Sequence, residues 1–118
     1  MMKKDEIEFT EFLEVEKKLE VKVGEIISVE EIEGTDKLLK LVVDFGDETK
    51  VSVTNIKEKL NDMFGDFNLI KGKVSPFVVN LKPSKMRGVT SEVMIMPMTN
   101  SVGDFLFLES SHIGVNII

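Results

Sequence analysis

The sequence predicts a small domain built mainly of β-strands, with two short helices. Apolar and polar residues alternate in several short runs, which is typical of strands with one buried face. Glycine, proline and aspartate separate these runs, and helical spacing of apolar residues is confined to two segments. A chain of 118 residues is long enough for one core. We expect one domain over residues 1–118, with an N-terminal helical segment (1–18) and a C-terminal extension (99–118).

The N-terminal third predicts a helix followed by a long, bent strand. Residues 6–15 place Phe9 and Phe12 at helical spacing, with acidic residues between them. From Leu19 onwards apolar and charged residues alternate, and the pattern loses its phase at Gly24. A glycine inside a long strand often marks a bulge that bends it. We expect the bend at Gly24 to let one strand pair in both halves of a small barrel.

The middle of the chain predicts a hairpin and then a helix. Residues 39–45 and 50–54 alternate between apolar and polar side chains, and Gly46-Asp47 is a typical two-residue turn between them. Asn55 is predicted to cap the following helix, because Glu58 stands three residues later and completes a capping box.

The second half predicts two further strands. The helix is expected to end at Gly65, and alternation over residues 77–81 predicts the fourth strand. The fifth strand is expected over Glu92–Met98. Three strands, a helix and two more strands is the count of a five-stranded OB-fold barrel. The pattern alone also allows another small α+β sheet.

Composition argues against catalysis and against a membrane location. The chain has no cysteine and one histidine, His112, which makes no obvious transition-metal site. Ser110 and Ser111 precede His112, but neither an orienting third group nor an oxyanion hole is indicated. No phosphate-cradle motif, signal peptide or run of membrane-spanning length occurs. We expect a cytoplasmic protein with no enzymatic activity, no cofactor, no metal and no membrane partner.

The charge is distributed unevenly. The net charge of −6 argues against indiscriminate nucleic-acid binding. Residues 1–33 hold 5 basic and 11 acidic residues, whereas residues 34–118 hold 10 of each. All of the excess acid therefore lies in the first third, and the acidic segment would repel RNA from the wrong face.

A short cationic loop stands between the fourth and fifth predicted strands. Lys82, Lys85 and Arg87 fall within six positions of one another. Pro83 restricts its own φ and that of the preceding residue, and Gly88 permits a tight turn. A stiff loop with three cations suits a partner that carries phosphates. The alternative is a solvated basic loop without a ligand.

The same loop carries a family resemblance. The run Asn80-Leu-Lys-Pro-Ser-Lys-Met-Arg-Gly-Val-Thr-Ser-Glu-Val-Met94 resembles the signature of the tRNA-binding domain family. Val23-Gly-Glu-Ile26 is similar to the first strand of that family, and Thr35-Asp-Lys-Leu38 is similar to its Ala-Asp-Lys-Leu turn. The likeness covers about residues 7 to 98. Family members include stand-alone structure-specific tRNA-binding proteins, the C-terminal module of methionyl-tRNA synthetases and the endothelial monocyte-activating polypeptide module.

The resemblance implies a fold and a function. It implies an all-β, five-stranded OB-fold barrel with a helix between strands 3 and 4, a short N-terminal helix and a C-terminal extension. It also implies recognition of tRNA by structure. Three positions depart from the family pattern: Ile32-Glu33 replace His-Pro, Thr54-Asn55 replace Ser-Gly, and Val93 replaces the glycine of Ser-Glu-Gly-Met. Val93 adds a branched side chain where the family leaves room.

The expected nucleic-acid-binding residues lie on and beside the cationic loop. We expect Lys82, Lys85 and Arg87 to contact phosphates, since guanidinium can bind two oxygens at once. Asn80 and Ser91, at the strand ends, would hydrogen-bond RNA or hold the loop. Lys37 and, less directly, Lys40 would extend the patch, and Met86 would pack beneath it.

The aromatic residues argue against a stacking platform. All eight are phenylalanine, and only Phe64 and Phe67 are candidates for exposure, so we expect recognition of backbone and shape.

Apolar residues on both faces of two late segments indicate a further contact. Residues 93–96 and 105–108 are apolar in both phases, and a small barrel buries one face of a strand. Either the tail covers the second face or a second copy does. Stand-alone family members resemble dimers, which favours a homodimer. The function expected is tRNA binding, in trans beside an aminoacyl-tRNA synthetase. The alternatives are a chaperone-like dimer with an apolar, Met-rich face and an assembly subunit that docks through its tail.

Overall fold

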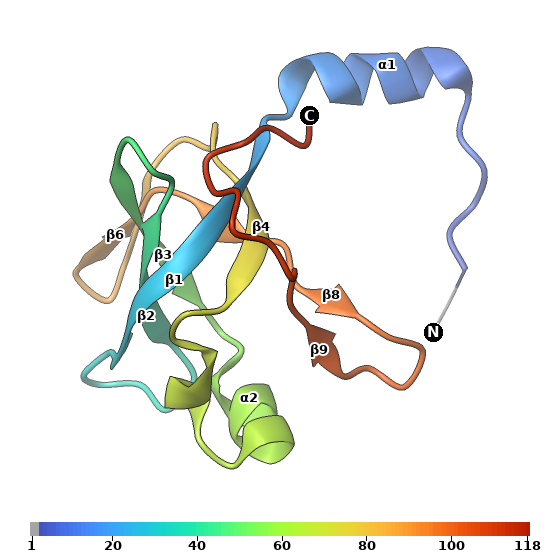
Figure 1. Ribbon diagram of the computed structural model, residues 1–118. Helices are drawn as coiled ribbons and strands as arrows, with labels where there is room; N and C mark the ends of the chain where they lie inside the picture. The colour runs from blue at the N-terminus through green and yellow to red at the C-terminus, as the bar shows by residue number, and fades with distance from the viewer. Residues whose placement is uncertain (1–2) are drawn as a thin grey trace.

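The computed structural model describes residues 3–118 and shows a five-stranded antiparallel sheet that curls into a nearly closed barrel. The strand order is β3-β2-β1-β4-β7 (Figure 1). These strands are β1 (Val21–Glu31), β2 (Leu39–Asp44), β3 (Thr49–Thr54), β4 (Val74–Val78) and β7 (Met94–Ile95). Ser91, Glu92 and Val93 hydrogen-bond to the free edge of β3, which brings the two ends of the sheet together. The expected five-stranded OB-fold is confirmed.

Strand β1 is long because it belongs to both halves of the barrel. Its residues 21–25 pair with β4, and its residues 25–31 pair with β2. The pairing register of β1 with β2 shifts between Ile26 and Ser28. The irregularity predicted at Gly24 therefore lies further along the strand than Gly24 itself. Gly24 instead serves close packing: a Cβ there would stand 2.5 Å from Val43 Cγ1 and 2.8 Å from the Phe45 ring.

The core fills the inside of this curved sheet. Its fully buried side chains alternate along the strands, as the period of two requires. Ten residues form the cluster: Ile26, Leu39, Leu41, Val43, Phe45, Leu60, Ile70, Phe77, Val93 and Ile95. The ring of Phe45 meets that of Phe77 edge to face, with 5.8 Å between their centroids.

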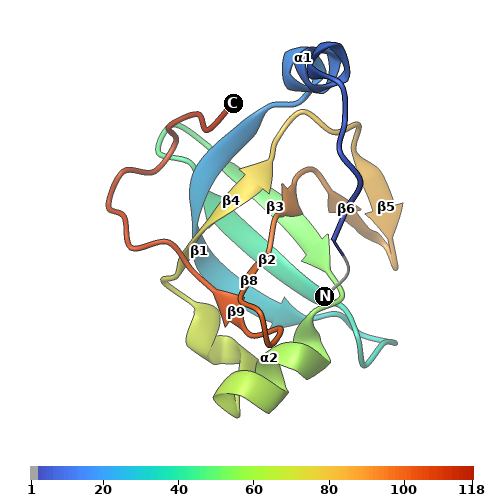
Figure 2. The same cartoon turned by 90° about the vertical axis from the view of Figure 1, so that its right-hand side faces the viewer.

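Helix α2 (Lys57–Phe64) and the 3-10 helix η1 (Phe67–Ile70) cover one end of the barrel (Figure 2). Gly65 ends α2 in the left-handed conformation, as predicted. The predicted cap is wrong, because the N-cap position is Ile56 and no side chain caps the helix. Phe64 and Phe67 pack against the core, which corrects the expectation that these two rings are exposed.

Helix α1 (Phe9–Lys18) projects away from the barrel, as Figure 1 shows. It begins three residues later than predicted and has no buried residue. Phe9 is 70% exposed and Phe12 45%, and their ring centroids lie 6.0 Å apart, so within residues 3–118 the two rings contact each other and remain largely uncovered. Within residues 3–118, neither helix has the length and apolarity needed to cross a bilayer.

The C-terminal extension partly covers the barrel. It forms a hairpin of β8 (Met98–Thr99) and β9 (Phe105–Leu106) and then runs along the first half of β1. There the backbones of residues 114–118 exchange hydrogen bonds with Val21 and Val23 at 2.7–3.1 Å. The tail thus occupies the edge of β1, while Leu106, Ile117 and Ile118 stay exposed.

Candidate nucleic-acid interface

The cationic segment is a β-hairpin rather than a loop. It consists of β5 (Ser84–Met86) and β6 (Val89–Ser91), with Met86 opposite Val89. Arg87 and Gly88 form the two-residue turn, and both have positive φ, 50° and 82°. Such turns match the twist of the flanking strands but favour glycine, asparagine or aspartate. Gly88 was predicted as a turn residue; the left-handed Arg87 was not.

Arg87 is the one non-glycine residue within 3–118 that has a positive φ. A side chain with a Cβ pays roughly 1 kcal/mol or more for this conformation. Backbone strain of this kind is often found where a side chain has to be presented in a fixed position. The turn therefore holds the guanidinium at the tip of the hairpin at some cost to stability.

The hairpin cations are exposed and carry no internal partner within the described chain. Lys82, Lys85 and Arg87 are all exposed. The ion pairs found among residues 3–118 are elsewhere: Lys50 with Glu48 and Glu92, and Lys57 with Glu31. Free ammonium and guanidinium groups on the hairpin and on Lys82 just before it leave three positive charges available to a ligand.

Ser91 anchors the hairpin to the barrel. It is 6% exposed, and its Oγ accepts a hydrogen bond from Val53 N at 3.0 Å and donates to Val93 O at 3.3 Å. Next to it, a Glu92 carboxylate oxygen accepts from Val51 N at 3.1 Å. Ser91 was expected either to hydrogen-bond RNA or to hold the cationic segment in place. Its burial fits the second role.

Asn80 ties the entry of the hairpin to the N-terminal helix. Its Oδ1 accepts a hydrogen bond from Glu20 N at 2.9 Å, and its Nδ2 donates to Lys18 O at 2.6 Å. Both polar atoms of the amide are thus engaged where α1 ends and β1 begins. The side chain remains exposed, although its hydrogen bonds are internal.

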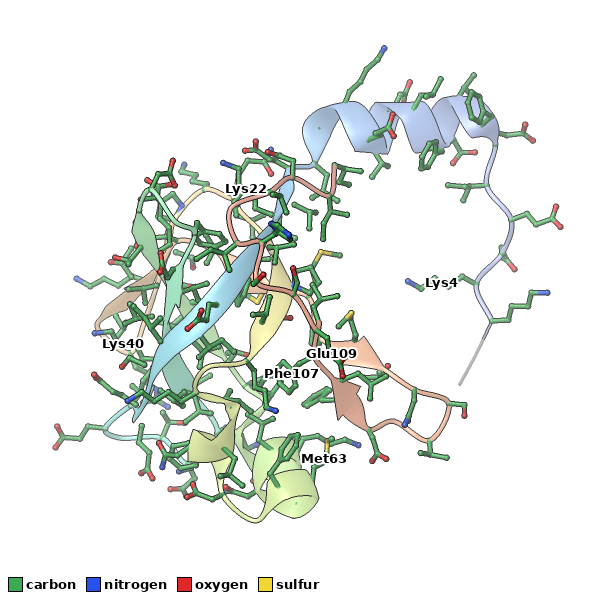
Figure 3. The ribbon with its side chains drawn as sticks, viewed as in Figure 1. Lys4, Lys22, Lys40, Met63, Phe107 and Glu109 are labelled. Carbon is green, nitrogen blue, oxygen red and sulfur yellow. The ribbon has the colours of Figure 1, made fainter. Side chains whose placement is uncertain are left out.

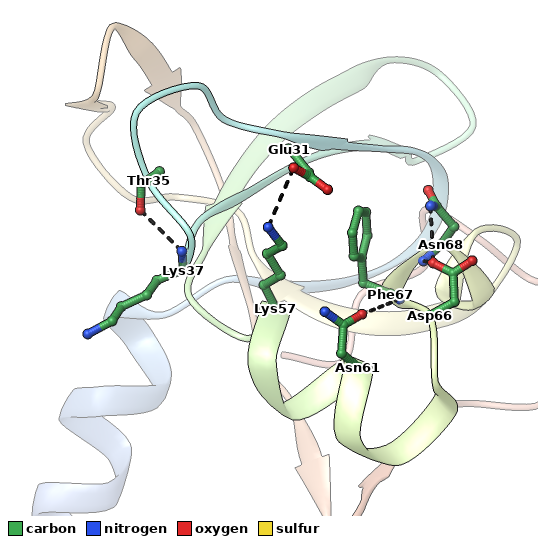
Figure 4. A network of polar contacts seen from close by, with 8 residues as sticks. All are labelled: Glu31, Thr35, Lys37, Lys57, Asn61, Asp66, Phe67 and Asn68. Carbon is green, nitrogen blue, oxygen red and sulfur yellow. Dashed lines mark hydrogen bonds and ion pairs between the residues drawn. The ribbon is translucent and has the colours of Figure 1, made fainter.

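Lys37 and Lys40 come from the β1–β2 loop and from β2. The backbone N–H of Lys37 donates to Thr35 Oγ1 at 3.2 Å, and its side chain points away from the Lys57–Glu31 pair (Figure 4). Lys40 is half-buried on β2, opposite Val53. In Figure 3 it projects from the left of the barrel, where strand β6 lies in Figure 1.

A small pocket lies beside the hairpin and was not anticipated from the sequence. It has a volume of about 220 Å³ and is lined by Leu38, Val53, Thr54, Asn55, Met86 and Met94. One sequence feature distinguishes this region, because Thr54-Asn55 stand where the family has Ser-Gly. The sequence predicts Asn55 as a helix cap, whereas the structure places it at the pocket.

Val93 does not crowd this surface. Its side chain is 1% exposed and belongs to the core cluster. The extra bulk relative to glycine is therefore accommodated inside the barrel.

This nearly closed five-stranded barrel, with an exposed cationic hairpin between β4 and β7, is an OB-fold domain. The family described as "Putative tRNA binding domain" matches residues 21–114. The chain belongs to this tRNA-binding domain family.

Individual relatives are similar to most of the chain. A methionine–tRNA ligase of Methanocaldococcus jannaschii is 38% identical over 93 residues, which is 77% of this chain and 13% of the ligase. The MetRS related protein of Pyrococcus horikoshii matches with a TM-score of 0.72 and 33% identity, covering 98% of this chain and 100% of that one. The CsaA chaperone protein of Picrophilus torridus matches with a TM-score of 0.71 and 25% identity, covering 96% and 100%. The chain spans only 11 to 13% of the length of these methionine–tRNA ligases.

Proposed function

We propose that this protein binds folded tRNA without catalysing a reaction. Lys82, Lys85 and Arg87 contact phosphates, Lys37 extends the contact, and Asn80 and Ser91 hold the strand ends on either side of the hairpin. The observation that carries the proposal is a set of three exposed cations without internal partners among residues 3–118: Lys85 and Arg87 on the anchored hairpin and Lys82 in the segment that leads into it. Membership of the tRNA-binding domain family supports it.

The charge distribution supports selective binding over indiscriminate binding. The acidic N-terminal third includes α1, whose Glu14 and Glu16 are exposed. A neutral body with one cationic hairpin attracts phosphates at that hairpin, and the acidic helix repels them elsewhere. A folded RNA that presents a phosphate contour of matching shape is favoured over a random polyanion.

The salt dependence of tRNA binding tests this proposal. Each phosphate contact releases counterions and steepens the plot of log affinity against log salt by about 0.7 to 0.9. We expect Lys85→Ala/Arg87→Ala to weaken tRNA binding and to reduce the slope by about 1.4 to 1.8. The measurement is a titration with bulk tRNA at several salt concentrations.

A matched control removes the same charge elsewhere. Lys71 and Lys73 are exposed in the segment between η1 and β4, away from the hairpin in both ribbon views (Figures 1 and 2). Lys71→Ala/Lys73→Ala should leave the slope unchanged within about 0.5. Equal slopes for the wild type and the hairpin variant would rule out this binding site.

We further propose that the protein is a homodimer that acts beside an aminoacyl-tRNA synthetase. The exposed rings of Phe9 and Phe12 and the exposed Ile117 and Ile118 provide apolar surface that a second copy would cover. Phe9→Ser/Phe12→Ser should then convert the dimer to a monomer in sedimentation measurements. A wild-type mass equal to that of one chain at every concentration would exclude the dimer.

A second candidate function is the binding of unfolded polypeptide. The exposed apolar side chains of α1 and the likeness to a CsaA chaperone protein favour it. Apolar binding persists when salt is raised, whereas RNA binding collapses. Titrations with bulk tRNA and with a reduced, unfolded polypeptide at two salt concentrations separate the two functions.

A further inference from the structure

The pocket beside the hairpin is not needed for phosphate binding. We propose that it holds one unpaired base of the RNA that the hairpin binds. This inference rests on the proposed tRNA-binding function and adds the chemical feature recognised there, a nucleobase that is free of its pairing partner.

The pocket lies where the hairpin meets the end of β3. Met86 contributes one wall and directly precedes Arg87 at the hairpin tip, while Met94 on β7 contributes another. Leu38, in the loop before β2, closes a further side. A group in this pocket would therefore lie next to the cations that bind the RNA backbone.

The volume suits a single ring system. The pocket measures about 220 Å³. A protein cavity of about 150 Å³ holds a benzene molecule, and sites for drug-sized ligands begin at about 300 Å³. One base fits between these limits.

The pocket lining combines apolar walls with polar groups. Methionine sulfur is polarizable and makes favourable contacts with aromatic rings, here from Met86 and Met94. Thr54 is 5% exposed and Asn55 is exposed; within residues 3–118 the Thr54 hydroxyl is not among the oxygen atoms buried without a partner, so both polar groups are open to a ligand. A base edge carries donors and acceptors for both groups, whereas an aliphatic or phenyl side chain would leave them unsatisfied.

The positively charged residues around the pocket suit a nucleotide within an RNA strand, which has a phosphate on each side. Lys85 and Arg87 flank Met86, and Lys37 precedes Leu38, so cations adjoin the pocket residues from two different segments. A base within a strand has a phosphate on each side, and cations from two segments can reach both. Of the neighbouring acids, Glu92 accepts from Val51 N and pairs with Lys50, while Asp36 is exposed in the β1–β2 loop.

Methionine methyl spectra of the full chain test this inference. The chain has seven methionines, and labelling their methyl carbons gives one signal for each. A base stacked in the pocket shifts the Met86 and Met94 signals upfield through its ring current. The probes are bulk tRNA, a nucleoside monophosphate, ribose 5-phosphate and N-acetyl-phenylalanine amide. Met63 on α2 and Met98 on β8 are internal controls, since neither lines the pocket.

We expect the tRNA and the nucleoside monophosphate to shift Met86 and Met94, and ribose 5-phosphate to leave both unchanged. If tRNA binds with the expected salt slope but neither signal moves, the pocket inference is wrong and the proposed function stands. If tRNA does not bind at all, both fail. If only N-acetyl-phenylalanine amide shifts the Met86 and Met94 signals, the proposal of a base in the pocket is wrong and the pocket binds a peptide side chain instead.

A variant pair tests the hydrogen bond without moving the cations. Thr54→Val keeps the shape of the side chain and removes the hydroxyl, and we expect a loss of tRNA affinity of about three- to tenfold with an unchanged salt slope. Thr49→Val makes the same change at the exposed start of the same strand and should have no effect. Equal affinities for the two variants would exclude Thr54 from base recognition.

Discussion

The hydroxyl of Ser91 accepts a hydrogen bond from the backbone N–H of Val53, with 3.0 Å between Oγ and N. This bond joins the end of the cationic hairpin to the free edge of β3, and both residues are buried. The position of the cations is therefore coupled to the closure of the barrel.

Removing this hydroxyl should weaken the whole fold. Ser91→Ala leaves the buried Val53 N–H without that acceptor, and we expect the free energy of unfolding to fall by about 1 to 3 kcal/mol in urea titrations. Ser84 is the backbone partner of Ser91 across the hairpin and is exposed, so Ser84→Ala is the matched control. It should change stability by less than about 0.5 kcal/mol. Equal stability of the two variants would refute the anchoring role.

The Asn80 amide should matter for helix α1 more than for RNA. Asn80→Ala removes the hydrogen bonds to Glu20 N and Lys18 O, so the α1–β1 junction should loosen. We expect faster hydrogen exchange in the last turn of α1 and a loss of about 0.5 to 1.5 kcal/mol in unfolding free energy. Affinity for tRNA should stay within twofold, a bound that corresponds to roughly 0.4 kcal/mol. Lost affinity with unchanged exchange would instead assign Asn80 to the RNA contact.

The strained turn predicts opposite effects on stability and on binding. Asparagine tolerates positive φ better than arginine, so Arg87→Asn should raise the free energy of unfolding by about 0.5 to 1 kcal/mol. The same change removes a phosphate contact and should weaken tRNA binding, with a salt slope lower by about 0.7 to 0.9.

Arg87→Lys is the control for the turn, since it keeps both the charge and the strain. Its stability should match that of the wild type, and its salt slope should be unchanged. A less stable Arg87→Asn variant would mean that the arginine side chain stabilises the turn.

The acidic residues of α1 should limit unselective binding. Glu14→Gln/Glu16→Gln removes two exposed negative charges, so affinity for duplex DNA should rise at low salt and converge with the wild type as salt screens the charges. Glu20 is left intact because its carboxylate accepts from Asn116 Nδ2 at 3.2 Å. The control Glu58→Gln/Asp62→Asn removes the same charge from α2, at the other end of the molecule in Figure 1. An equal rise in both variants would show that net charge alone is responsible.

Local patterns located strands β2 and β3 and the cationic segment, but β4 begins three residues before the predicted start at Phe77, and β7 covers two of the seven residues expected for the fifth strand. Strands β2 and β3 were predictable because Leu39, Leu41 and Val43 alternate with polar residues, and this period of two is a local property. The long family motif around Lys82 to Arg87 likewise identified the fold and the family. Local patterns of this kind need no knowledge of what lies across the barrel.

Which surfaces are free depends on contacts between segments that are far apart along the chain. Among the described residues, Phe9 and Phe12 have the spacing of a buried helix face but stay exposed, whereas Phe64 and Phe67 are partly buried because α2 and η1 pack against the core. The pocket between Thr54, Met86 and Met94 joins segments that are distant in sequence. Periodicity records which side of an element is apolar, and burial depends on long-range contacts that no local pattern encodes.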